Sequence, residues 1–145
     1  MLFKQTNRTD PEQVFVVCRN TSGGSLSAGV PVFMEVDAIT DGNAVSQAGA
    51  TTEFELFVGV TDSAMSDDDY GLIQVYGYRQ SAYVSGASAG CAAGVPLLPV
   101  AGQNYLTDTT SSATGQWNHV HLMETIAAAA AGSTVLQYNV FIRAL

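Results

Sequence analysis

Basic side chains are scarce in this chain of 145 residues, where five lysines and arginines stand against thirteen acidic residues and the formal net charge is -8. Between Arg19 and Arg79 there are nine carboxylates and no basic side chain. Nucleic acids and anionic membranes are expected to repel such a protein. Because Lys4 is the only lysine and does not follow a glycine, a phosphate-binding P-loop is also excluded.

Charge of either sign is uncommon. Charged residues make up 12% of the chain and hydrophobic residues 47%, whereas a soluble globular protein has roughly 25% charged residues. A soluble monomer normally keeps a charged surface. We therefore expect neighbouring subunits to cover part of this surface, as in an oligomer or a lattice.

Cysteine is also rare, with Cys18 and Cys91 alone. Two thiols at this spacing make neither a disulfide framework nor a metal cluster, and each is expected to be a small apolar filler. The first seven residues lack the apolar core of a signal peptide, so we expect assembly in the cytoplasm with both thiols reduced. The uncharged segment 80–107 is too polar and too interrupted by proline to span a membrane, and we expect a long loop and a strand there.

The periodicity that the sequence does have is that of β-strands. Apolar and polar side chains alternate in residues 134–143, 30–36 and 53–60, as expected of strands with one buried face. Three shorter strands are predicted at residues 14–19, 72–84 and 120–126.

Turns rich in glycine and aspartate separate these segments, among them residues 21–25 and 67–71. Many short strands with such breaks predict a mostly β fold, an antiparallel β-sandwich or small β-barrel. We expect an N-terminal arm and first strand in residues 1–19, and a single β domain in residues 20–145.

A short segment is repeated within the sequence, since AGVPV at residues 28–32 recurs as AGVPL at residues 93–97. Proline is tolerated in the first position of a strand, where its missing N–H costs no ladder bond. Each copy is therefore expected to begin a strand that is entered from a glycine-rich loop. Two five-residue matches do not by themselves establish a repeat protein.

Two groups of residues could hold a metal ion. His119 and His121 would share one face of a strand, with Glu124 nearby, but no further histidine or cysteine completes a zinc ligand set. The run from Asp67 to Asp69 offers carboxylates to calcium but lacks the order of an EF-hand loop. In both places the simpler interpretation is an exposed or interface group, and no metal or other cofactor is predicted.

No complete catalytic constellation occurs in the sequence. There is no G-x-S-x-G elbow, and no recognisable cysteine–histidine pattern. Glu53 and Glu55 are paired carboxylates, but glutamates two apart on a strand that faces solvent are ordinary. We therefore do not predict an enzyme.

Aromatic residues are the better candidates for a functional surface. Five of them lie among small and polar residues rather than in apolar runs: Tyr76, Tyr78, Tyr83, Tyr105 and Trp117. Aromatic side chains bury a large area at modest entropic cost, and they anchor many interfaces. We treat these five as interface candidates, with core packing as the alternative for each.

Several segments taken together resemble small virion proteins of tailed bacteriophages. They are SLSAGVPV at 25–32, VGVTD at 58–62, DYGLIQVYGY at 69–78, ETIAAA at 124–129 and VFIR at 140–143. In those proteins a loop leads into a strand, a VGV strand follows, and a G-x-x-Q-V-x-G strand precedes a segment rich in alanine and glycine. The likeness extends over about residues 20–145 and is one of pattern.

This resemblance implies a capsid decoration, or cement, protein. Such proteins form trimers or other small oligomers on the outside of the phage head, and they clamp neighbouring copies of the major capsid protein. Many have a β-barrel or β-tulip body and a flexible N-terminal arm. Here residues 1–12 would be the arm, with Lys4 and Arg8 as further contact candidates.

A second hypothesis stays open, that of a carbohydrate-binding or adhesin-like β-domain in a head fibre or tail component. Exposed tyrosines and Trp117 could stack on sugar rings. A small enzyme or metal protein that uses His119 and His121 is a third hypothesis.

Overall fold

The computed structural model describes residues 12–36, 42–48, 56–86, 90–100, 102–108, 119–127 and 135–144. Within these residues it has nine β-strands and no α-helix, which confirms the mostly β fold. The strands are β1 (Gln13–Asn20), β2 (Pro31–Met34), β3 (Ala44–Ser46), β4 (Phe57–Thr61), β5 (Tyr70–Ser85), β6 (Leu97–Pro99), β7 (Leu106–Asp108), β8 (Val120–Leu122) and β9 (Val135–Arg143).

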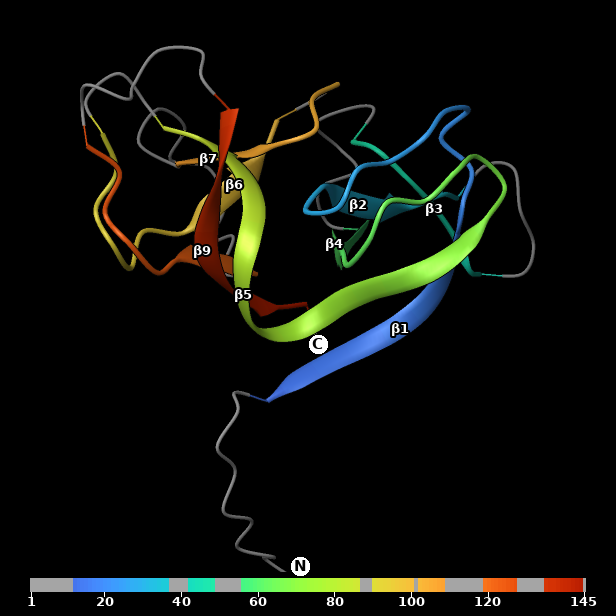
Figure 1. Cartoon of the computed structure of the whole chain (residues 1–145), viewed down its shortest axis with the longest axis horizontal. Helices are drawn as coiled ribbons and strands as arrows, with labels where there is room; N and C mark the ends of the chain where they lie inside the picture. Colours follow the sequence, from blue (N-terminus) through green and yellow to red (C-terminus); the bar gives the residue numbers. More distant parts are fainter. Residues whose placement is uncertain are drawn as a thin grey trace, which may run out of the picture.

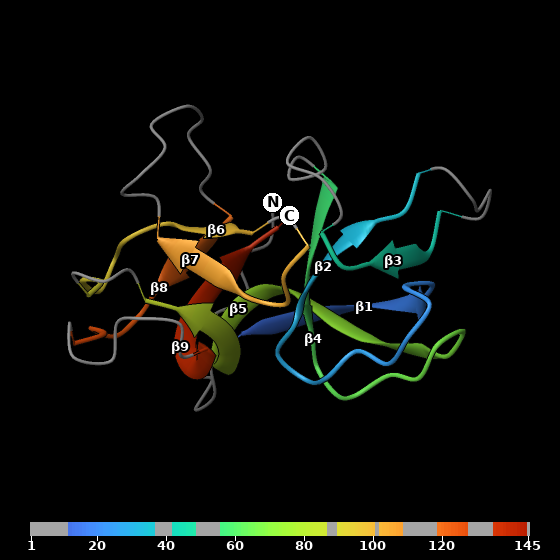
Figure 2. The same ribbon diagram turned by 90° about the horizontal axis from the view of Figure 1, so that it is seen from above.

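The strands form two lobes that lie side by side and share one long strand, β5 (Figures 1 and 2). The first lobe contains β1 to β4 with the first half of β5, and the second contains the rest of β5 with β6 to β9. β5 and β9 are rich in tyrosine, valine and isoleucine, which favour the extended backbone of a strand.

In the first lobe the strand pairings close into a ring. β1 pairs antiparallel with β5 and parallel with β3. β3 pairs with β2, β2 with β4, and β4 with β5, all antiparallel. Each of these five strands thus has a neighbour on both sides, and the β1–β3 pairing is limited to Arg19 and Asn20 of β1.

The second lobe repeats this order. β5 pairs antiparallel with β9 and parallel with β7, while β7 pairs with β6 and β9 with β8. A bridge between Pro96, directly before β6, and His121 in β8 closes the ring. The two parallel pairs make the sheet mixed, whereas the sequence predicted an antiparallel β-sandwich or small β-barrel.

Corresponding residues of the two lobes make the same backbone hydrogen bonds. Leu26 and Met65 exchange two N–H···O bonds of 2.9 Å in the first lobe. Cys91 and Ile126 exchange two such bonds of 3.0 and 2.8 Å in the second lobe. The side chains differ, so what is repeated is the path of the backbone.

The two copies of the repeated segment, residues 28–32 and 93–97, lie at equivalent places in the two lobes. Pro31 opens β2 and faces Val60 of β4, and Pro96 precedes β6 and faces His121 of β8. Each proline thus stands where a strand begins, as the sequence predicted. The chain is built from two copies of one five-strand module that have β5 in common.

Glycine is required at the entrance to β2. Gly29 has φ +88°, and a Cβ there would lie 2.4 Å from the carbonyl oxygen of Ser81 in β5. Gly94 has nearly the same φ, +87°, at the equivalent position of the second lobe. Glycine adopts this conformation without the steric cost that a Cβ imposes.

β5 passes from one lobe to the other at an irregularity. Its register against β9 shifts between Arg79 and Ala82, so that Gln80 and Ser81 do not fit the regular ladder. An extra residue in a strand bends it and increases its twist. This local bend allows one strand to serve both rings (Figure 1).

Two clusters of buried apolar side chains fill the lobes. The first lobe encloses a cluster that includes Leu26, Val32 and Ile73. The cluster of the second lobe also takes in Phe33 and Phe57 from the first, whose ring centroids lie 5.7 Å apart. The lobes are therefore packed on each other through a continuous apolar contact.

The strands predicted at 14–19, 30–36, 53–60, 72–84, 120–126 and 134–143 correspond to β1, β2, β4, β5, β8 and β9. Residues 53–55 lie outside the described part, as do residues 1–11, which make up most of the predicted arm. Segment 80–107 contains the end of β5 and then β6 and the start of β7, so it holds more strand than was predicted.

Candidate functional site

The predicted interface tyrosines are all half-buried, and they occur in separate places. Tyr76 packs edge-on against Phe141 of β9, with ring centroids 5.5 Å apart. The carbonyl group of Tyr78 accepts hydrogen bonds from Gln13 and Gln74. The ring of Tyr76 and the backbone of Tyr78 therefore stabilise the junction of β5 with its neighbours. Trp117, Lys4 and Arg8 lie outside the described residues.

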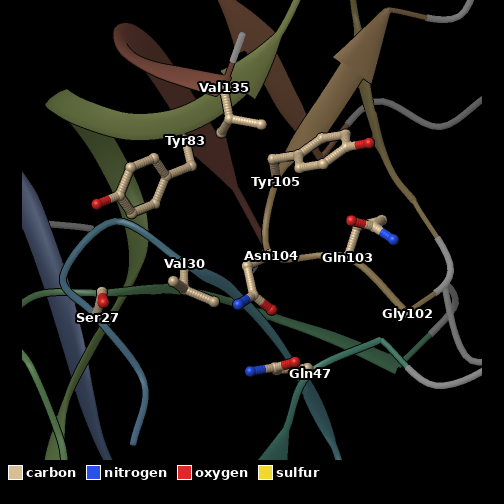
Figure 3. A pocket seen from close by; sticks show the side chains of 9 residues that line it. All are labelled: Ser27, Val30, Gln47, Tyr83, Gly102, Gln103, Asn104, Tyr105 and Val135. Atoms are coloured by element: carbon tan, nitrogen blue, oxygen red, sulfur yellow. The ribbon is translucent and has the colours of Figure 1, made fainter. Parts of the chain in front are cut away.

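Tyr83 and Tyr105 come together at a cleft between the lobes, which has a volume of about 370 Å³. Tyr83 projects from β5, and Tyr105 directly precedes β7. Their rings lie on opposite sides of the cleft, with Val135 of β9 between them in this view (Figure 3). Tyr83 also packs against the apolar cluster of the first lobe, which fixes one wall.

Amide side chains supply the polar part of this cleft. Gln47 follows β3 in the first lobe, and Gln103 and Asn104 belong to the loop before β7 in the second. The loop is held to the first lobe because the N–H of Gly102 donates to the carbonyl oxygen of Ala48, at 2.6 Å. Residues of both lobes thus form one cleft, which we name the interlobe cleft.

A second feature is an apolar strip on the outer face of the β1–β5 pair. Val17 and Leu72 are directly opposite each other in the ladder and are 58% and 43% exposed. Tyr70 lies two residues along on the same face and is 61% exposed. Opposite residues of an antiparallel pair point to the same side, so these three side chains form one surface. We name it the outer strip.

A buried polar cluster lies beside this strip. Gln74 is 1% exposed and Arg79 6% exposed, and the Arg79 guanidinium donates to the side chains of Gln74 and Asp62 and to the carbonyl group of Ser81. Burial lowers the pKa of Arg79, while the hydrogen bond and the charge of Asp62 raise it. The cluster joins the loop after β4 to the bend in β5.

The acidic turn at residues 67–69 binds the neighbouring turn rather than standing apart. Asp67 accepts a hydrogen bond of 3.0 Å from the N–H of Gly23, and Asp68 forms a 2.8 Å ion pair with Arg19. The buried side chain of Asn20 donates to the carbonyl groups of Gly24 and Ser66. These contacts fix the end of the first lobe.

His119 and His121 flank the buried Val120 and are half-buried. Nδ1 of His119 lies 3.3 Å from the carbonyl oxygen of Arg143, and its ring lies 6.1 Å from that of Phe57. Glu124 accepts a hydrogen bond from the N–H of Asn139. Among the described residues, no three histidine, cysteine, aspartate or glutamate side chains are grouped so that they could hold a metal ion.

Sequence reasoning missed the outer strip, the interlobe cleft as one site, and the buried Arg79. Val17 and Leu72 could have been found from the strand pattern, because each is an apolar residue on the polar face of its strand. Gln47, Gln103 and Asn104 gave no signal, since they are ordinary loop residues in two distant segments.

No helix among the described residues has the length and apolar character needed to cross a membrane. The chain matches no protein-family model, and no curated protein matches it significantly.

Proposed function

We propose that this protein is a structural virion protein, a cement or decoration subunit that binds the outside of a tailed-phage head. Its partners would be the major capsid protein and further copies of itself, in a homotrimer. The proposal starts from the resemblance in pattern over about residues 20–145 and from the low content of charged residues.

The duplicated module is the observation that carries the proposal furthest. A capsid presents the same subunit many times, so a clamp has to meet two neighbouring copies of one surface. A chain with two lobes of the same backbone architecture on a shared strand holds two separate surfaces at a fixed separation. Such bivalent contact strengthens binding without requiring a tight contact at either lobe.

The outer strip supports an assembly role in the same way. Val17, Tyr70 and Leu72 are large apolar side chains, each more than two-fifths exposed. A contiguous exposed apolar surface commonly marks a contact with another protein. Stabilising a shell requires buried interface area and no reactive group.

Binding to heads tests the proposal. The protein is mixed with expanded heads of the same virus that lack it, and the heads are then sedimented. We expect saturable co-sedimentation at a fixed ratio to the major capsid protein. Leu72→Asp should weaken binding, because a carboxylate cannot be buried in the contact without a large desolvation cost.

Met123→Asp is the matched control, since Met123 is 47% exposed and lies in the second lobe away from the outer strip. Equal binding of both variants would remove the outer strip from the contact. Failure of the unaltered protein to bind heads would contradict the cement role itself.

A further inference from the structure

We propose that the interlobe cleft binds a neutral saccharide. This inference goes beyond the cement role and does not depend on it, because the cleft and the outer strip consist of different residues.

The walls of the cleft suit a ligand with flat apolar faces. Tyr83 and Tyr105 lie on opposite sides of it, and the half-buried Val135 adds apolar surface between them (Figure 3). Sugar rings have C–H-rich faces and hydroxyl-bearing edges, and they pack these faces on aromatic rings. The volume of about 370 Å³ falls within the roughly 300–1,000 Å³ of small-molecule sites.

The polar groups of the cleft suit hydroxyl groups. An amide side chain donates and accepts hydrogen bonds at once, as a sugar hydroxyl does. Within the described part of the chain, the side chains of Gln47, Gln103 and Asn104 and the hydroxyls of Tyr83 and Tyr105 make no hydrogen bond to another residue. Three amide side chains from both lobes therefore remain available to a ligand in one cleft, while the two tyrosine hydroxyls point away from each other (Figure 3).

A purely apolar ligand would cover these amides without satisfying them, which costs free energy for each unpaired group. An acidic sugar is also disfavoured, because no described residue of the lining is basic and the chain carries a net charge of -8. A neutral sugar avoids both costs, because its hydroxyl groups can pair with the amides and it carries no negative charge.

The site is one for binding and not for hydrolysis. Glycoside hydrolases commonly use two carboxyl groups, one on each side of the scissile bond. The described lining residues include no aspartate or glutamate. A bound oligosaccharide is thus expected to be released unchanged.

Saturation-transfer NMR with the full chain tests the inference. The probes are maltotetraose, cellotetraose, chitotriose and a mannotetraose, each at up to about 10 mM so that a millimolar Kd is detected, with trigalacturonate as the acidic comparison. We expect binding of at least one neutral probe, no binding of trigalacturonate, and no cleavage of any probe.

Variants locate the binding. Tyr105→Ala should weaken it about tenfold, as truncation of a central aromatic anchor does, and Asn104→Ala, at an exposed position, should weaken it without affecting folding. Tyr70→Ala and Gln80→Ala are matched controls outside the cleft and should change Kd less than twofold. Absence of binding by every neutral probe would overturn the inference, and so would equal losses in the cleft and control variants.

Discussion

Nη1 of Arg79 lies 3.2 Å from Oδ1 of Asp62, at the place where β5 leaves the first lobe and enters the second. The guanidinium is 6% exposed and the carboxylate 42% exposed, so the ion pair joins a buried cation to a partner at the surface. Arg79 also donates to the side chain of Gln74, before the bend, and to the carbonyl group of Ser81, within it. This one side chain thus fixes the geometry between the two modules.

Removal of the Arg79 side chain should destabilise the fold strongly. Arg79→Ala leaves the buried Gln74 amide without a hydrogen-bond donor and opens a cavity, and we expect a loss of about 3 kcal/mol in the free energy of unfolding. Asp62→Asn should cost about 1 kcal/mol, because water already reaches this carboxylate. Urea titrations monitored by tyrosine fluorescence measure both losses.

Arg143→Ala serves as the control, since Arg143 is exposed at the end of β9 and should change stability by less than about 0.5 kcal/mol. A similar loss for Arg79→Ala and Arg143→Ala would contradict the structural role of the buried guanidinium.

The equivalent glycines of the two lobes provide a second test. Gly94→Ala should cost about 1–2 kcal/mol, the cost of a left-handed conformation, because no described atom lies within 4 Å of the added Cβ. Gly29→Ala carries the same backbone cost and adds a clash with the Ser81 carbonyl group. It should therefore destabilise the protein by at least about 2 kcal/mol more.

Thermal or urea unfolding of the two alanine variants gives the comparison directly. If Gly29→Ala were no more destabilising than Gly94→Ala, that result would contradict the close contact between Gly29, before β2, and the carbonyl group of Ser81 in β5.

The buried thiol of Cys18 predicts a dependence of stability on pH. Burial raises the pKa of Cys18 above its usual value of 9.0. When the pH rises above 9.0, the thiol ionises in the unfolded chain while it stays protonated in the folded chain, so unfolding becomes more favourable. The stability that Cys18 contributes is therefore complete below pH 9.0 and decreases above it.

Comparison with Cys18→Ala isolates this contribution from other titrations. The difference in unfolding free energy between the two proteins should decrease as the pH rises above 9.0. Folded protein should also resist a thiol reagent at both Cys18 and Cys91, which are buried, and react once urea is added. Rapid labelling of Cys18 in the folded state would contradict its burial.

The oligomeric state can be measured by light scattering. The proposed trimer should have about three times the chain mass of 15.2 kDa. We expect association because the chain has few charged residues and because a contact between subunits would cover the exposed outer strip. A monomer at all concentrations would contradict the trimer while leaving the bivalent clamp possible.

The sequence predicted six of the strands, five of which have at least four residues in which alternation can show, whereas β8 has three and was predicted within the longer segment 120–126. β3, β6 and β7 have three residues each, too few for a period of two to be recognised. β3 and β7 also make the two parallel pairings, which depend on partners far away in the chain. Tertiary contact rather than local pattern determines these strands.

The duplication of the five-strand module was visible in the sequence only as one repeated segment of five residues. Backbone N–H and C=O groups make the equivalent pairings, and every residue except proline has both. Side chains at equivalent positions can therefore diverge, as Leu26 and Met65 have from Cys91 and Ile126. The cleft was hidden for a related reason, since its residues come from separate segments that only the packing of the lobes brings together.

The most direct test of the cement role is the occupancy of the protein on phage heads. Expanded heads of the same virus, purified without it, are mixed with the full chain and sedimented, and the ratio of the two proteins is measured by quantitative electrophoresis. The account predicts saturation at a fixed ratio and greater resistance of the decorated heads to heat or chelation. No saturable binding, with heads equally fragile in its presence and absence, would contradict it.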